Sequence, residues 1–209
     1  LNFWSPDHFD LIVCDEAHHA ISRSWQKVLK YFSNAKVLGV TATPDRGDNK
    51  NLGVYFENIA YEISLLDLIK QGYLAPITVK SIPIQINISN VKSVAGDFDD
   101  NELDSALTPY LPQIARAIKE HASFRKTLVF LPLIATSKRF VDICNSIGLS
   151  AKHIDGESKD RHQLIKDFKR WDFDVLCNAM LLTEGYDEPD IDCIAILRPT
   201  RSRPLYAQM

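Results

Sequence analysis

The feature that most constrains the fold of this chain is the alternation of short apolar runs with stretches of helical periodicity. Residues 11–14 and 36–40 are apolar runs of strand length, and the segment between them spaces its apolar residues by one, three and four. A strand, a helix and a second strand with short connections form the unit from which helix-covered parallel sheets are built. The first part of the chain therefore predicts a buried parallel sheet, with a helix of about four turns over residues 17–32.

The same alternation returns from about residue 107 and is more complete there. Helix-period stretches precede three of the apolar runs, and a further run closes the series. The expected strands are at residues 127–131, 151–154, 175–177 and 193–197. This pattern predicts a second α/β unit with a parallel sheet.

The middle of the chain has a different pattern. A short helix candidate at 65–71 is followed by residues 77–88, where isoleucine and valine mostly alternate with polar residues, as in a strand with one solvent-facing side. The acidic, glycine-bearing residues 95–102 indicate a loop or the approach to a helix. We therefore expect three parts: residues 1–75, a connecting strand and linker at 76–106, and residues 107–209.

Composition excludes several classes of protein. With 45% hydrophobic and 24% charged residues, the chain is not expected to be disordered. It has no apolar stretch of the ~18–20 residues that span a membrane and no signal pattern, which favours a cytoplasmic protein without a membrane partner. The four cysteines form no Cys-x-x-Cys pair, so they predict neither a zinc cluster nor a disulfide framework. A net charge of −3 is not that of a strongly basic nucleic-acid binder.

Two carboxylates, Asp15 and Glu16, follow the first apolar run directly and begin an Asp-Glu-Ala-His sequence that ends at His18. In open α/β sheets, ligands bind beyond the carboxyl ends of the strands. One carboxylate there can hold a nucleotide-bound Mg²⁺, and its neighbour can orient or deprotonate an attacking water. The structural alternative is that Asp15 caps the helix and Glu16 favours its first turn electrostatically.

A second polar sequence, Thr-Ala-Thr-Pro at 41–44, follows the second apolar run and places the hydroxyls of Thr41 and Thr43 at the same sheet edge. The alternative for these threonines is a turn before the proline. Together, the two sequences resemble motifs II and III of the DEAH-type superfamily 2 helicases and translocases. In that family two RecA-like domains of the P-loop NTPase fold clamp ATP between them. Arg46 and Asp48 continue the form seen in the branch with restriction motors and DNA-repair helicases.

The resemblance continues through the second unit. Residues 127–130 look like motif IV, and residues 153–157 look like the Asp-Gly-Glu segment of this family. Residues 180–189 match motif V nearly position for position, and residues 198–209 look like the approach to motif VI. The resemblance covers nearly all of the chain and is weaker over 50–106.

The resemblance implies roles for the matching residues of the first unit. Asp15, with Glu16 beside it, would hold Mg²⁺, and Glu16 would be the catalytic base. His18, together with Thr41 and Thr43, would link the nucleotide site to movement of the second domain.

It also implies roles in the second unit. Gly185 would allow close approach of the backbone, Asp187 would contact the nucleotide ribose, and Thr183 would touch the nucleic-acid backbone. Gln208, at the start of motif VI, would contact the nucleotide. The alternative for motif V is a glycine loop with a solvated acid.

The resemblance thus implies an α/β fold with two RecA-like parallel-sheet domains, the first incomplete at its N-terminus. It implies ATP and Mg²⁺ as cofactors, nucleic acid as a partner, DNA before RNA, and restriction or repair subunits as further partners. The expected activity is that of the motor core of an ATP-dependent helicase or translocase. The alternative is a non-catalytic RecA-like remnant that binds nucleic acid or protein.

Several parts of the family pattern are missing from these residues. No Gly-x₄-Gly-Lys-Ser/Thr phosphate loop occurs, and the arginine pair of motif VI is absent. The chain begins at Leu1 without a methionine, so we expect it to be a piece of a longer protein, inactive as an ATPase by itself. We also expect the sheet of residues 1–75 to be stabilised by a partner, by self-association or by a preceding segment.

Overall fold

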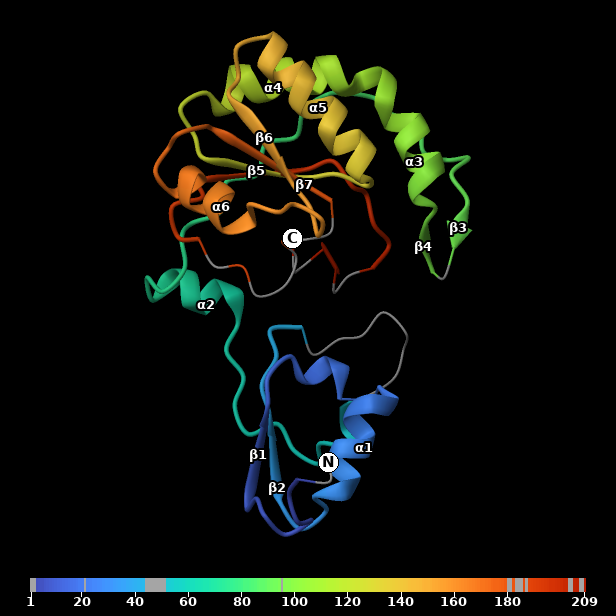
Figure 1. Cartoon of the computed structure of the whole chain (residues 1–209), viewed down its shortest axis with the longest axis vertical. Coiled ribbons are helices and arrows are strands. Elements are labelled where there is room, and N and C mark those ends of the chain that lie inside the picture. Colours follow the sequence, from blue (N-terminus) through green and yellow to red (C-terminus); the bar gives the residue numbers. More distant parts are fainter. Residues whose placement is uncertain are drawn as a thin grey trace. The chain divides into compact units, whose positions relative to one another are not determined.

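The computed structural model describes residues 3–20, 22–43, 52–94, 96–179, 182, 186, 188–202, 205–206 and 209. The chain divides into two compact units, Leu1–Lys80 and Ser81–Met209 (Figure 1). This division falls inside the segment 76–106 that the sequence predicts as a connection, and the three-part division itself stays a prediction.

The first unit is built on two parallel strands, β1 (Leu11–Cys14) and β2 (Lys36–Gly39). Within the described residues they form the strand pair of this unit, and α2 (Leu65–Lys70) and the 3₁₀ turn η2 (Leu52–Val54) follow them. A two-stranded sheet buries little apolar surface. Accordingly, Val13 and Val40 are 58% and 52% exposed, and an apolar groove of about 360 Å³ opens between β1 and the helix that follows it.

The helix predicted over residues 17–32 forms as two pieces. These are a 3₁₀ turn, η1 (Ala17–His19), and a helix, α1 (Arg23–Tyr31). Ser22 separates them because its backbone is extended, with φ −67° and ψ 149°. The apolar periodicity thus identifies the right segment and misses the break.

The second unit contains a four-stranded parallel sheet in the order β6-β7-β5-β8, which confirms the predicted α/β fold with a parallel sheet (Figure 1). Its strands are β5 (Thr127–Phe130), β6 (Ala151–Ile154), β7 (Val175–Asn178) and β8 (Cys193–Ile196). Its helices are α3 (Asp100–Leu107), η3 (Thr108–Tyr110), α4 (Leu111–Ala122), α5 (Ile134–Ser146) and α6 (Arg161–Lys169).

Helices cover both faces of this sheet. Val129 of β5 belongs to a core cluster with residues of α4 and α5, whereas its neighbours Leu128 and Phe130 pack with Phe168 of α6. Successive residues of a strand point to opposite faces of the sheet, so a strand between two helical layers is apolar throughout. All four residues of β5 are buried for this reason.

The strand predicted at residues 77–88 is wrong. These residues carry no strand in the structure. Most of the remaining predicted linker consists of α3 and a short antiparallel hairpin, which β3 (Ser93–Val94) forms with β4 (Asp97–Phe98). The alternation does reflect one-sided burial, because Ile84 and Ile86 pack against the core of the second unit. A strand also needs a neighbouring strand for its backbone hydrogen bonds, which alternation alone does not supply.

None of the helices in the described part of the chain is both long enough and apolar enough to cross a bilayer.

Candidate functional site

Asp15 and Glu16 lie directly beyond the end of β1. The Asp15 side chain accepts a hydrogen bond from the Glu16 N–H at 2.9 Å, and Asp15 itself is exposed. Glu16 adopts the left-handed conformation, with φ 48° and ψ 49°, which is uncommon for a residue with a side chain and is concentrated at functional sites. Glu16 holds the cap position of η1, yet its side chain makes no capping hydrogen bond there. Helix capping therefore does not explain this residue.

The ends of β1 and β2 are joined by backbone hydrogen bonds. The Val40 N–H donates to the Cys14 carbonyl at 2.8 Å, and the Ala17 N–H donates to the Val40 carbonyl at 2.9 Å. Gly39 makes this approach possible, because a Cβ there would lie 2.6 Å from the Phe56 ring and 2.9 Å from the Ala17 Cβ. The two polar sequences that follow these strands are consequently brought to one edge of the sheet.

His18 lies at the centre of that edge and is only 5% exposed. Its Nδ1 is 3.0 Å from the Thr41 hydroxyl, 3.3 Å from the Thr43 hydroxyl and 3.3 Å from Glu16 Oε2. The Thr41 hydroxyl also accepts the Thr43 N–H at 3.1 Å, so Thr41 shapes the turn as well as contacting the histidine. The structure thus brings together four of the five predicted site residues of this unit, with Asp15 adjacent to them in the chain.

This pair of carboxylates fits a magnesium ion held jointly with a nucleotide. Among the described residues, no group of three or more His, Cys, Asp or Glu is arranged to hold a metal ion. Mg²⁺ in nucleotide sites is bound by one or two carboxylates together with phosphates and waters, so it needs no such group. An exposed Asp15 beside Glu16 at a strand end matches that donor set.

The predicted site residues of the second unit, Thr183, Gly185, Asp187 and Gln208, lie outside the described residues. A neighbouring residue that the sequence analysis missed is Asn178, which is fully buried at the end of β7.

The Asn178 amide joins two strands to the segment that follows. Its Nδ2 donates to the Val129 carbonyl at 3.1 Å, and its Oδ1 accepts the Leu182 N–H at 3.4 Å. The sequence signal that could have identified Asn178 is its place as a polar residue at the end of an otherwise apolar strand.

Two lysines hold the segment after residue 187. Lys169 Nζ lies 2.9 Å from Glu188 Oε2, and the fully buried Lys126 lies 3.5 Å from Asp190 while donating to the Lys169 carbonyl at 3.0 Å. Burial, with the negative charge of Glu188 in addition, raises the pKa of Tyr186 to about 12. Its hydroxyl therefore stays protonated across the physiological range.

Known proteins resemble both units. Residues 3–46 match the family model described as "Type III restriction enzyme, res subunit", and residues 109–209 match "Helicase conserved C-terminal domain". The protein named "Putative ATP-dependent helicase IRC3" from Saccharomyces cerevisiae is 30% identical over 222 residues, which cover 100% of this chain and 32% of that relative. A "Type I restriction enzyme EcoAI endonuclease subunit" from Escherichia coli is 36% identical over 100 residues, which cover 46% of this chain and 12% of the relative.

A solved structure is similar as well. It is the fragment of "a putative HsdR subunit of a type I restriction enzyme from Vibrio vulnificus YJ016", with a TM-score of 0.76 and 25% identity over 99% of this chain and 40% of that one. The chain spans about a third of the length of the helicase relative.

Parallel-sheet units with an Asp-Glu-Ala-His sequence at a strand end, matched in chain order by a restriction-subunit model and a helicase model, define a protein of the RecA-like helicase fold. Within that class, the chain belongs to the superfamily 2 helicases and translocases, in the branch that includes restriction motors.

Proposed function

We propose that this chain is the motor-core portion of an ATP-dependent DNA helicase or translocase, which couples hydrolysis of Mg²⁺-bound ATP to movement on nucleic acid. The observation that carries the proposal is the contact of His18 with both Thr41 and Thr43. This contact joins the segment that carries the two carboxylates to the segment that follows β2. A displacement of the carboxylates therefore alters the hydrogen bonds of Thr41 and Thr43.

In this proposal each polar residue of the first unit has a distinct task. Asp15 holds Mg²⁺, which neutralises phosphate charge when it is bound, and Glu16 accepts a proton from the attacking water. Glu16 also lies 3.3 Å from His18 Nδ1, so a proton gained by its carboxylate changes the hydrogen bond that it can form with that ring nitrogen. His18 then passes the change to the two threonine hydroxyls, whose rotatable O–H groups can exchange partners.

The second unit completes the proposed site. We assign Gly185, Asp187 and Gln208 to the nucleotide and Thr183 to the nucleic-acid backbone on the strength of the motif match. DNA is the proposed track, with restriction or repair subunits as partners, because one relative is named a restriction-enzyme endonuclease subunit and another a DNA 3'-5' translocase. We place the protein in the cytoplasm on the sequence pattern, although the Schizosaccharomyces pombe relative is named mitochondrial.

The test uses the whole protein that contains this chain and measures ATP hydrolysis with and without DNA. Glu16→Gln keeps the size of the side chain but removes the base, so DNA-stimulated turnover should fall ~10²–10⁴-fold. Glu62→Gln, at an exposed position of the same unit, should leave turnover unchanged. The 209-residue chain alone should show no turnover above background.

A second variant separates hydrolysis from movement. Thr41→Val removes the hydroxyl that contacts His18 with little change in volume, so hydrolysis should persist while displacement of a DNA-bound block is lost. A wild-type protein that binds DNA without any turnover would exclude the motor and favour a non-catalytic remnant. A Thr41→Val protein that moves along DNA at the wild-type rate would exclude the coupling role.

A further inference from the structure

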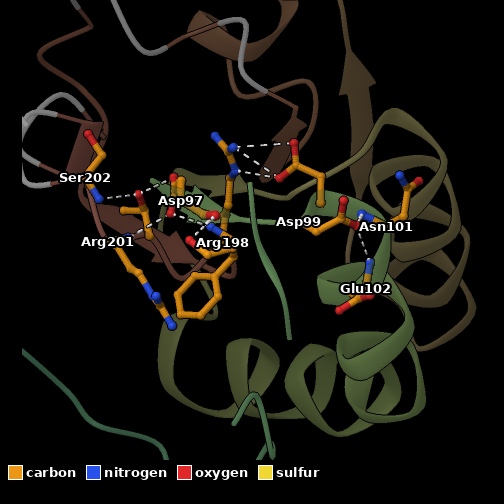
Figure 2. A network of polar contacts seen from close by, with 11 residues as sticks. Asp97, Asp99, Asn101, Glu102, Arg198, Arg201 and Ser202 are labelled. Carbon is orange, nitrogen blue, oxygen red and sulfur yellow. Dashed lines mark hydrogen bonds and ion pairs between the residues drawn. The ribbon is translucent and has the colours of Figure 1, made fainter. Parts of the chain in front are cut away.

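A polar network joins the β3–β4 hairpin and the start of α3 to the segment 198–202, which follows β8 (Figure 2). The two sides of the network are 98 to 104 residues apart in the chain. All of the residues that form it lie in the second unit and within the described part of the chain.

The first link is an ion pair between the buried Arg198 and the partly exposed Asp100. Arg198 is 7% exposed, and its guanidinium donates to Asp100 Oδ1 from Nη2 at 3.1 Å and from Nε at 3.3 Å. Such bonds are charge-assisted, and their fixed fork geometry orients both partners. The pair therefore fixes the chain where it leaves β8 relative to the first turn of α3.

The second link is Asp97. Its carboxylate accepts the Thr200 hydroxyl at 2.6 Å and the Arg201 N–H at 2.8 Å, and the Arg201 guanidinium lies 4.6 Å from the centre of the Phe98 ring. Burial by itself raises the pKa of Asp97. The hydrogen bonds from Thr200 and from the N–H groups of Arg201 and Phe98, together with the charge of Arg198, outweigh it and keep that pKa below its usual value. Asp97 is thus a permanent acceptor at neutral pH.

Thr200 connects Asp97 to Ser202. Its hydroxyl donates to Asp97 and at the same time accepts the Ser202 N–H at 2.9 Å. The Ser202 hydroxyl then accepts the Leu205 N–H at 3.3 Å, and the Ser202 carbonyl accepts the Tyr206 N–H at 3.0 Å. A serine hydroxyl that accepts the N–H three residues later makes the hydrogen bond of an N-cap, so Ser202 holds the backbone at Leu205 and Tyr206.

Two neighbouring carboxylates do only local work. Asp99 caps α3 by accepting the N–H groups of Asn101 and Glu102, each at 3.0 Å. Glu102 pairs with the exposed Lys92 at 2.7 Å. Glu102 therefore supplies a control in the same helix, because the bonds described for its carboxylate run to Lys92 and not to segment 198–202.

We propose that Asp97 and Asp100 are positioning residues that hold segment 198–202 and thereby fix the place of Leu205 and Tyr206, whose N–H groups bind Ser202. The next residues in the chain lead to Gln208, which the proposed function assigns to the nucleotide and which lies outside the described residues. The inference rests on that proposed function and extends it. The rate of a reaction falls when a group that acts on the reacting phosphate is displaced. Holding segment 198–202 in place therefore favours ATP turnover.

The first measurement concerns the network itself and needs no activity. Amide hydrogen exchange is followed in the 209-residue chain for Thr200→Val, Asp100→Asn and the control Glu102→Gln. Thr200→Val keeps the side-chain shape, so the amides of Ser202, Leu205 and Tyr206 should exchange at least ~10-fold faster while those of β5 do not change. Glu102→Gln should leave both sets unchanged. Unaltered exchange at Ser202, Leu205 and Tyr206 in Thr200→Val would overturn the proposal.

The second measurement uses the same three variants in the whole protein. Thr200→Val and Asp100→Asn should lower kcat for DNA-stimulated hydrolysis ~10–100-fold with little change in KM for ATP, as expected when a group acting in the transition state is misplaced. Glu102→Gln should match wild type. If wild type itself does not hydrolyse ATP, the proposed function fails while the exchange result stands. If wild type is active and Thr200→Val keeps its kcat despite faster exchange, the positioning role is overturned.

Discussion

Polar side chains at the ends of strands recur as organising points in both units. His18 follows β1 within the first unit, and Asn178 and Asp155 stand at the ends of β7 and β6 in the second. Each is buried and has hydrogen-bond partners, as buried polar groups require. Among them, Asp155 is held in its ionised form by its surroundings.

Asp155 lies in a set of donors that stabilise its ionised form. His153 Nε2 lies 3.0 Å from one carboxylate oxygen, and the Ser158 hydroxyl and the Glu157 N–H donate to the other at 2.8 and 3.0 Å. Lys138 Nζ is 3.7 Å away. The hydrogen bond from His153 contributes most, and that from Ser158 next, to lowering the pKa of Asp155 to about 2. Burial has a smaller, opposing effect.

Acid should therefore destabilise the second unit through Asp155. Its folded-state pKa of about 2 lies below the unfolded value, near 4, so its stabilising effect is complete above pH ~4 and is lost as the pH falls toward 2. Asp155→Asn should lower the free energy of unfolding by ~1–3 kcal/mol at neutral pH and flatten its dependence on pH between 4 and 2. Urea unfolding at a series of pH values measures both, with the exposed Glu157→Gln as control. An unchanged pH slope in Asp155→Asn would contradict the assignment.

At the scale of secondary-structure elements, side-chain periodicity and strand pairing prove to be separable. Residues 82–88 alternate in exposure as a strand would, and Ile84 and Ile86 contact the core, yet no neighbouring strand pairs with them. Burial of one side is thus enough to produce the pattern. The strands β1 and β2 show the converse, because they pair although much of their apolar surface is exposed.

This one-sided packing predicts unequal effects of neighbouring substitutions. Ile86→Ala should lower the free energy of unfolding of the second unit by ~1–2 kcal/mol, since a partly buried isoleucine loses three carbons of apolar contact. Gln85→Ala, on the exposed side, should stay within ~0.5 kcal/mol. Urea unfolding followed by the fluorescence of Trp171 in the second unit measures both. Equal losses at the two positions would show that the segment does not pack on one side.

At the scale of the whole molecule, the two units differ in how much core they build. The second unit has apolar clusters on both faces of a four-stranded sheet, whereas Leu11 and Val13 of β1 in the first unit are more than half exposed. Local stability follows buried apolar contact. The units should therefore open with different free energies.

Amide hydrogen exchange of the 209-residue chain tests this difference. Amides of β1 and β2 should exchange at least ~10-fold faster than those of β5 and β7, because fewer apolar contacts must be broken to expose them. In the whole protein, or with an added partner, slower exchange in β1 and β2 would support the prediction that another segment completes this sheet. Equal protection of both units in the chain alone would contradict it.

Local pattern predicted much of this protein. Apolar runs located six strands, four of them in the helix-covered sheet of the second unit, where a strand between helices must be apolar. The carboxylates of 15–16 follow the first of the six runs, as predicted. The family resemblance rested on the same short sequences. These features depend on residues close together in the chain.

Only the tertiary structure decided which distant side chains meet. The break at Ser22, the unpaired segment 77–88 and the contact of Arg198 with Asp100 are not written in any local pattern. The last of these joins residues 98 positions apart, and nothing in either segment specifies the other. Such pairs form because folding of the intervening sheet and helices brings them together, and burial then requires each charge to find its partner.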